Sequence, residues 1–321
     1  MKDFLLSIKK IKKLPKFFSK KRILLYGSPL VLFLLLFLIV FIDLNTQRYL
    51  QNNKVAEAPI ELPDLSLYPI LKSPLNPDIT AQAAIVMDDD SKAVLFAQKP
   101  HLRFSMASTT KIMTALIGLS YYKLDDVLEV MTSNVEGSLL GLMEGEKMTF
   151  ENLLYGMLLP SGNDAALTIA DNYSGGETEF VKKMNDKAIE LRLYNTHFSD
   201  TNGLDDYGDY TTVLDLARLA SIALKNKEFS KIVSTKKIDI ADITDEHTYS
   251  IKNLNKLLGI SGVDGIKTGF TDEAQGVLVT STIKNGHRLI IVVMKSEDRF
   301  ADTKTLLDLI SGNFTYLSIH P

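Results

Sequence analysis

A stretch of twenty uncharged residues, 23–42, limits where a folded domain can begin in this chain. The stretch, ILLYGSPLVLFLLLFLIVFI, is about as long as a helix must be to cross roughly 30 Å of hydrocarbon in a bilayer. A basic segment, residues 1–22, precedes it with nine Lys or Arg and one acidic residue, Asp3. The positive-inside rule keeps such a segment in the cytoplasm. We therefore expect a cytoplasmic tail at 1–22, a single-pass transmembrane helix at 23–42 and everything after residue 42 outside the cell.

Two other interpretations of residues 23–42 stay open. The stretch could be a buried core helix. A cleaved signal peptide is the stronger alternative, but its small-x-small cleavage signal is missing from DLNTQRYLQ, residues 43–51. We therefore favour an uncleaved anchor. The chain has no cysteine, so disulfide usage gives no information about the compartment.

Proline is concentrated directly after the apolar stretch. Five of the ten prolines lie within residues 43–79, a spacing that suits an extended stalk. The remaining residues, 80–321, contain regular apolar patterns, and we expect them to form one packed domain.

The patterns within residues 80–321 predict strands at both ends and helices between them. Residues 83–88 and 93–97 alternate around a polar turn and predict a hairpin, as do residues 277–283 and 288–294 around Asn285-Gly286. Helices are expected at 108–119, at 151–172 as two segments broken at PSGND, at 211–224 with Thr211 or Thr212 as N-cap, and at 301–314. This order predicts a mixed α/β (α+β) fold with a mainly antiparallel sheet, built from both ends of the domain and covered by helices.

The pattern Ser-x-x-Lys occurs at five places and is weak by itself. It begins at Ser7, Ser108, Ser120, Ser234 and Ser281. Only Ser108, within RFSMASTTKIMTALIGL (residues 103–119), stands at the start of a long apolar helix. That helix carries Lys111 inward with it. A serine hydroxyl becomes a good nucleophile when a nearby base removes its proton, and a lysine can be that base if burial or a nearby cation lowers its pKa. The alternative is a serine that only caps the helix, beside a solvated lysine.

Two further motifs follow in the chain. Ser161-Gly162-Asn163 lies between two predicted helices, and Lys267-Thr268-Gly269 precedes a glycine-flanked strand region. Each could be an ordinary turn when taken alone. In this order, however, the three motifs match the Ser-x-x-Lys, Ser-x-Asn and Lys-Thr-Gly signature of β-lactamases and penicillin-binding proteins, with Gly162 in the middle position.

The wider sequence resembles the D-alanyl-D-alanine carboxypeptidases, the low-molecular-mass penicillin-binding proteins of peptidase family S11. The resemblance covers residues 80 to 315 and rests on ASTTKIMTAL, LLPSGNDAA, THFSDTNGLDD, YTTVLDLARLA and GVDGIKTGFT in the family's order. It implies a β-lactamase/penicillin-binding-protein transpeptidase-like fold and makes residues 80–321 a serine DD-peptidase catalytic domain. It also implies removal of the terminal D-alanine from peptidoglycan stem peptides through an acyl-enzyme, with β-lactam antibiotics as inhibitors.

The resemblance implies a role for each matching residue. Ser108 would be the nucleophile and Lys111 its base. Ser161 would pass a proton toward the leaving amine, and Asn163 would hold Lys111 and a substrate amide.

The third motif would bind the substrate. Lys267 would lower the pKa of Lys111 by its charge and attract the terminal carboxylate, which Thr268 could also bond. Gly269 would leave room for a peptide along the strand edge. The backbone amides of Ser108 and Phe270 would form the oxyanion hole, worth about 3 kcal/mol per donor.

Cofactors and other partners are not expected. A net charge of −3 gives no argument for nucleic acid, and the five histidines show no metal-binding spacing. We expect a single-pass protein of a bacterial cell membrane with its catalytic domain outside the cytoplasm.

Three alternative functions stay open. A DD-endopeptidase that cuts cross-links would use the same residues. A class A β-lactamase would need a deacylating glutamate, for which Glu190 in ELRLYN is out of register by one. A non-catalytic cell-wall scaffold or penicillin sensor could keep the fold.

Overall fold

The computed structural model describes residues 32–34, 36–46, 68–204, 208–284 and 286–317, and the chain divides into two units, Met1–Asp64 and Leu65–Pro321. In the first unit, residues 32–34 and 36–46 are helical with exposed side chains. None of the helices in these described ranges is both long and apolar enough to cross a membrane. The predicted tail at 1–22 and half of the predicted transmembrane helix at 23–42 fall outside the described residues, so both stay predictions.

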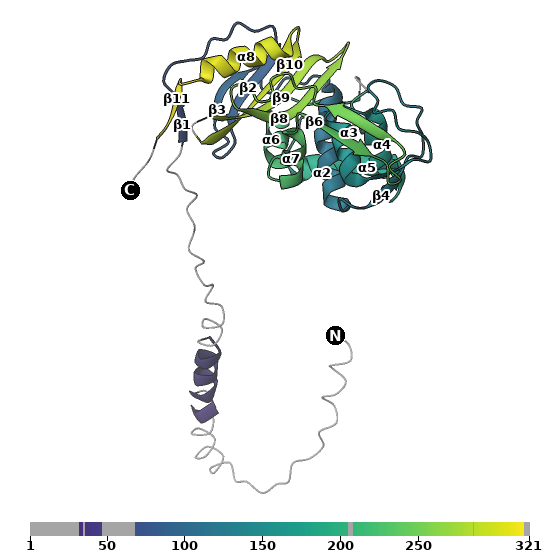
Figure 1. Ribbon diagram of the computed structural model, residues 1–321. Helices are drawn as coiled ribbons and strands as arrows, with labels where there is room; N and C mark the ends of the chain where they lie inside the picture. Colours follow the sequence, from purple (N-terminus) through teal and green to yellow (C-terminus); the bar gives the residue numbers. More distant parts are fainter. Residues whose placement is uncertain (1–31, 35, 47–67, 205–207, 285, 318–321) are drawn as a thin grey trace, which may run out of the picture. The chain divides into compact units, whose positions relative to one another are not determined.

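A five-stranded antiparallel sheet forms the centre of the second unit (Figure 1). Its first two strands come from the start of this unit and its last three from the end, as the sequence predicted. In spatial order they are β3 (Val94–Gln98), β2 (Ala83–Asp88), β10 (His287–Ser296), β9 (Gln275–Lys284) and β8 (Val263–Thr271). Among the described residues, strand β8 therefore has only one sheet neighbour, β9, and no strand pairs with its other edge.

Both faces of the sheet are covered, which explains why β2 is buried at all six positions. Side chains alternate between the faces of a strand. Ile85 and Met87 of β2 pack in one core cluster with the helices, whereas Val86 packs in a second cluster with Leu306 and Ile310 of α8 (Arg299–Ile310). Figure 1 shows α8 along one face of the sheet.

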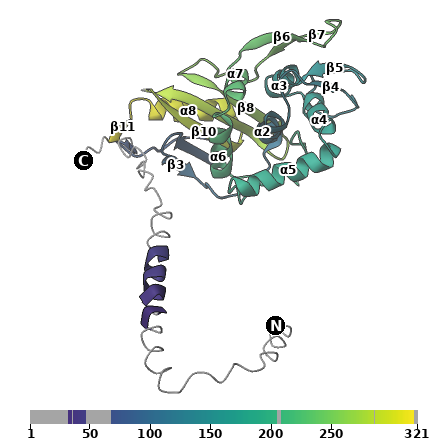
Figure 2. The same cartoon turned by 90° about the horizontal axis from the view of Figure 1, so that it is seen from below.

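The other helices pack against the opposite face and extend beyond it (Figure 2). They are the 3-10 helix η2 (Ala107–Thr110), α2 (Lys111–Tyr121), α3 (Phe150–Leu158), α4 (Asn163–Asp171), α5 (Gly176–Glu190), α6 (Val213–Ala223) and α7 (Lys227–Val233). Thr212 is the N-cap of α6, where its side chain accepts a hydrogen bond from the amide of Asp215.

Three two-stranded sheets complete the unit. They pair β1 (Tyr68–Leu71) with β11 (Phe314–Leu317), β4 (Val127–Glu129) with β5 (Lys147–Thr149), and β6 (Lys237–Ala241) with β7 (Thr248–Lys252).

The packed unit begins earlier than the predicted boundary at residue 80. Strand β1 lies inside the predicted stalk, 43–79, but pairs with β11 at the other end of the unit. The amides of Thr80 and Ala81 are also fixed, because both donate to the carboxylate of Asp302 on α8. The frequent prolines argued against a strand here. Pro69 is nevertheless tolerated in this two-stranded sheet, where it only removes one backbone N–H donor. Residues 47–67 of the predicted stalk lie outside the described residues.

Candidate active site

Ser108 lies in the 3-10 helix η2, and Lys111 begins the α-helix α2 that follows it. The sequence predicted one continuous helix from 108. Side chains at i and i+3 eclipse one another in a 3-10 turn, so this geometry brings the two side chains together more directly than an α-helix would. Lys111 Nζ donates to Ser108 Oγ at 3.1 Å.

Two further acceptors, from segments distant in the sequence, hold the Lys111 amine. Its Nζ donates to Asn163 Oδ1 and to the backbone oxygen of Asn202, each at 2.7 Å. The side chain has no exposed surface. A lysine buried to this degree needs such partners, because an unpaired polar group in the interior destabilises the fold.

Burial lowers the pKa of Lys111 to about 7, because it disfavours the charged ammonium form. Three carboxylates, Asp200, Asp164 and Asp209, act in the opposite direction and limit the shift. Burial is thus the main cause, rather than the charge of Lys267 that the resemblance implies. An amine with this pKa is largely available as a base near neutral pH.

The loop beside Asn163 is built around the neighbouring Asp164. Oxygens of the Asp164 carboxylate accept hydrogen bonds from the amides of Leu140, Gly141 and Leu142 at 2.7 to 3.0 Å. Asn163 itself donates from Nδ2 to the backbone oxygen of Glu136 at 2.6 Å, which orients its Oδ1 toward Lys111. Both residues stand at the start of α4, directly after the predicted Ser-Gly-Asn turn begins. The Asn163 side chain is thereby positioned for Lys111, and the Asp164 side chain for the loop.

Ser161 and Lys267 form a second contact in the same site. Lys267 Nζ donates to Ser161 Oγ and to the backbone oxygen of Thr268, each at 2.9 Å. Ser161 has a φ of +70°, a strained conformation that turns its side chain out of the helical path between α3 and α4. The pKa of Lys267 is held well below its usual range, first by burial and then by the nearby charges of Lys111 and Arg299.

Gly269 allows strand β8 to approach the nucleophile. A Cβ at this position would lie 3.1 Å from both Ala107 Cβ and the backbone oxygen of Met106, and 3.3 Å from the amide nitrogen of Ser108. These distances are at or below the limit of ordinary contact, so a side chain would push β8 away. The next residue, Phe270, has an exposed side chain on the open-edge strand.

The sequence motifs missed two contributors to this site. Asn202 holds Lys111 through its backbone oxygen. Gly203 beside it has a φ of +84°, and a Cβ there would lie only 2.0 Å from the backbone oxygen of Ala107. Both belong to THFSDTNGLDD, a segment that carried the family resemblance but received no role. A signature made of three sequence motifs cannot identify a backbone oxygen, because every residue type carries one.

Arg299 is the second missed residue. Its guanidinium carbon lies 5.8 Å from the centre of the Phe270 ring and its charge acts on Lys267. Its Nε is buried and has no hydrogen-bond partner within the described part of the chain. An isolated arginine at the start of α8 carries no motif that would have identified it.

The family comparison matches this arrangement. The model of the peptidase S11 family, described as D-alanyl-D-alanine carboxypeptidase, matches residues 71–298. This chain belongs to that family. The predicted family is thereby confirmed, and with it the expectation of a serine peptidase.

Individual relatives are similar over most of the packed unit. D-alanyl-D-alanine carboxypeptidase DacF of Bacillus subtilis is 36% identical over 75% of this chain, although the match spans only 64% of the length of DacF. A D-alanyl-D-alanine endopeptidase of Pseudomonas aeruginosa is 32% identical over 73% of this chain and 78% of its own length.

Solved structures of the family have the same architecture. The DD-transpeptidase of Streptomyces K15 has a TM-score of 0.69 and 34% sequence identity, with 73% of this chain and 98% of that chain covered. The predicted fold class is confirmed by this similarity and by the antiparallel sheet.

Proposed function

We propose that this protein is a serine-type D-Ala-D-Ala carboxypeptidase that removes the terminal D-alanine from peptidoglycan stem peptides. One observation carries the proposal within this family: the fully buried Lys111 amine, with a pKa of about 7, is in contact with Ser108 Oγ. A neutral amine at this position can act as a general base, whereas a solvated lysine near pH 7 cannot.

Acylation begins with a proton transfer from Ser108 to Lys111. As the proton moves to Nζ, Oγ attacks the carbonyl carbon of the penultimate D-alanine and a tetrahedral oxyanion forms. The amides of Ser108 and Phe270 are proposed to bind this oxyanion. Gly269 supports that assignment, because its missing side chain lets β8 come within reach of the Ser108 amide.

Collapse of the tetrahedral intermediate breaks the peptide bond and leaves an ester on Ser108. The departing amine of D-alanine must take up a proton. Ser161 is proposed to deliver it, since its hydroxyl accepts a hydrogen bond from Lys267 and can donate its own proton onward. The Lys111 ammonium returns a proton to Ser161, so the proton that left Ser108 ends on the amine and Lys111 is neutral again for hydrolysis of the ester. Asn163 keeps the protonated Lys111 amine in place during this step.

The terminal carboxylate of the substrate is proposed to bind near Lys267, Thr268 and Arg299. An anion arriving there favours the protonated form of Lys267, whose pKa the burial has lowered. Arg299 Nε, which has no hydrogen-bond partner among the residues that the structure describes, offers a further donor. The substrate main chain would lie along the open edge of β8 as an added strand.

Water then hydrolyses the ester and frees Ser108. A β-lactam would acylate the same hydroxyl by opening its ring, and we expect β-lactam antibiotics to inhibit the enzyme. No step calls for a metal or an organic cofactor.

A DD-endopeptidase is the second candidate, favoured by the relative of that name in Pseudomonas aeruginosa. A β-lactamase is disfavoured, because the side chain of Glu190 is 62% exposed and pairs with Lys187 at 2.6 Å on α5. Glu190 is therefore not oriented to activate a water molecule at Ser108.

The direct experiment incubates the full-length protein in detergent with two substrates. One is a stem pentapeptide ending in D-Ala-D-Ala, and the other is a cross-linked dimer of stem peptides. Mass spectrometry then identifies the products. Loss of one alanine from the pentapeptide supports the carboxypeptidase, and cleavage of the dimer alone supports the endopeptidase. No product together with no labelling by a fluorescent penicillin would favour a non-catalytic scaffold.

We further propose that residues 23–42 anchor the protein in the bacterial cell membrane, with 1–22 in the cytoplasm and the catalytic domain outside. The length of the apolar stretch and its basic flank support this. Protease added to intact spheroplasts should then digest the catalytic domain. Recovery of the full-length chain in the soluble fraction would contradict the anchor, and a shortened membrane-free form would indicate signal-peptide cleavage.

A further inference from the structure

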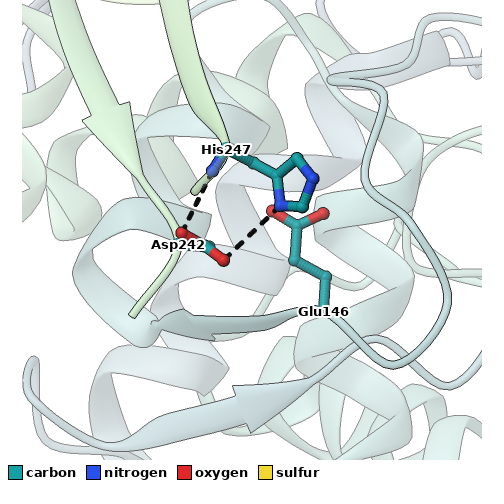
Figure 3. Close-up of side chains that lie close together, drawn as sticks. All are labelled: Glu146, Asp242 and His247. Carbon is teal, nitrogen blue, oxygen red and sulfur yellow. Dashed lines mark hydrogen bonds and ion pairs between the residues drawn. The ribbon is translucent and has the colours of Figure 1, made fainter. Parts of the chain in front are cut away.

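Three potential metal ligands from separate segments meet away from the catalytic residues (Figure 3). Glu146 lies in the turn before β5, Asp242 directly follows β6, and His247 directly precedes β7. They line a pocket of about 360 Å³ formed by residues 143–147 and the tip of the β6–β7 hairpin.

The ligand atoms are close enough to share one ion. One side-chain atom from each of the three residues lies within 4.8 Å of the other two, and His247 Nδ1 is 3.5 Å from Asp242 Oδ2. In a tetrahedral zinc site with bonds of about 2.0 to 2.1 Å, neighbouring ligand atoms are roughly 3.3 Å apart. Small side-chain rotations would therefore complete the site.

The imidazole provides a second, independent indication. His247 Nδ1 has almost no exposed surface, yet it forms no hydrogen bond among the residues that the structure describes. The ring nitrogen faces two carboxylates that are themselves 8% exposed or less. Nδ1 lies at ion-pair distance from Asp242 Oδ2, and a cation could bind both atoms and balance two neighbouring negative charges.

The surrounding residues orient both carboxylates. The Tyr249 hydroxyl contacts both oxygens of Glu146 at 2.8 Å, and the amide of Met143 donates to Oε2 at 2.9 Å. The Thr244 hydroxyl donates to Asp242 Oδ2 at 2.7 Å. Such outer hydrogen bonds are typical of metal sites, where they fix the ligands before the ion binds.

We propose that Glu146, Asp242 and His247 bind one divalent zinc ion, with water as the fourth ligand. The mixed nitrogen and oxygen donor set selects zinc over calcium or magnesium, which prefer oxygen ligands alone. The proposal does not depend on the carboxypeptidase activity. Histidine spacing could not predict it, since Glu146 is about a hundred residues from the other two ligands.

The ion would hold the hairpin tip onto the loop that borders the catalytic residues. The hairpin already touches this loop where the amide of Ile243 donates to the Lys147 oxygen at 3.0 Å. From Glu146 the contacts continue through the amide of Met143 and then Leu142, which donates to Asp164 beside Asn163. Zinc would thus stabilise the segment that positions Asn163.

The test measures metal binding by the tag-free, full-length protein in detergent after treatment with a chelator. Isothermal titration with ZnCl₂ should give one equivalent, and saturating zinc should raise the unfolding midpoint by about 5 °C. The variants Glu146→Gln, Asp242→Asn and His247→Ala should each weaken zinc binding at least ~10-fold. Circular dichroism checks that each variant is folded.

His287 is the matched control. Its Nδ1 lies 3.8 Å from Asp90 Oδ2, so it forms a histidine–aspartate pair, but the described residues offer it no third ligand comparable to Glu146. His287→Ala should leave zinc binding within twofold of the wild type. The proposal is overturned if folded Glu146→Gln, Asp242→Asn and His247→Ala bind zinc like the wild type, if His287→Ala abolishes binding, or if calcium binds as tightly as zinc.

Discussion

The catalytic residues and the proposed zinc ligands are two polar clusters of the same unit. They differ in the hydrogen bonds that their buried nitrogen atoms form. Lys111 Nζ donates to three oxygens within 3.1 Å. His247 Nδ1, by contrast, has no hydrogen bond among the described residues. The Lys111 amine is therefore held in place without a ligand, as preorganised catalysis requires. Within that part of the chain, His247 Nδ1 has only the 3.5 Å contact with Asp242 Oδ2, and we infer that an ion binds between these atoms.

The comparison predicts that removing the Ser108 hydroxyl reduces activity more than any other change. In Ser108→Ala no hydroxyl remains to form an ester, so labelling by fluorescent penicillin and D-alanine release should both be undetectable. The unfolding midpoint should stay within a few degrees of the wild type, since Ser108 is only partly buried. Residual labelling at the wild-type rate would show that another residue is acylated.

Removal of the base should be the next largest effect. Lys111→Met keeps the length of the side chain but not the amine, and should slow acylation by about 10²- to 10⁴-fold. The control is Lys123→Met, which alters the Ser-x-x-Lys pattern at Ser120 and should change the rate less than twofold. Equal losses in the two variants would contradict the role assigned to Lys111.

A smaller reduction of the acylation rate is expected when β8 is displaced from η2. In Gly269→Ala the new methyl group would crowd Ala107 and Met106, so the Ser108 and Phe270 amides would separate. Stopped-flow acylation by penicillin should be at least ~10-fold slower, because a misplaced donor loses much of its transition-state stabilisation. An unchanged rate would mean that β8 need not lie this close.

The smallest effect should come from a change outside both clusters. Thr212→Ala removes the cap of α6 and should lower the free energy of unfolding by about 1 kcal/mol. Thr212→Ser keeps the capping oxygen and should lose less. Thermal denaturation of the two variants measures the difference, and acylation rates below the unfolding range should not change. An Ala variant as stable as the Ser variant would show that the cap contributes little.

The fold was predictable where short patterns suffice. Short apolar runs beside turn residues, at 83–88 and 288–294, identified strands of the sheet, and Thr212 was one of two proposed caps. The stalk boundary was wrong, because β1 is stabilised by β11 from the far end of the chain and not by its own sequence.

The site was predictable to the extent that its groups lie in contiguous motifs. Ser108, Lys111, Ser161, Asn163 and Lys267 were selected from sequence. The structure joins the first two and Asn163 by hydrogen bonds, joins Ser161 to Lys267, and brings the two lysines near enough for their charges to interact. Their catalytic roles remain predictions. The Asn202 oxygen and Arg299 were missed, as were the ligands of the proposed zinc site, because only the folded chain brings these groups together.

The central claim, that burial prepares Lys111 as the base for Ser108, is tested most directly by the pH dependence of acylation. A base with a pKa of about 7 is mostly protonated at pH 6 and mostly neutral at pH 8, so the rate of penicillin acylation should rise about tenfold between these values. Stopped-flow measurements on the full-length protein would give this profile, with Lys123→Met as control. A midpoint near 7 in both proteins is the predicted result. A rate that does not change from pH 6 to 8, or that keeps rising toward pH 10, would contradict the account.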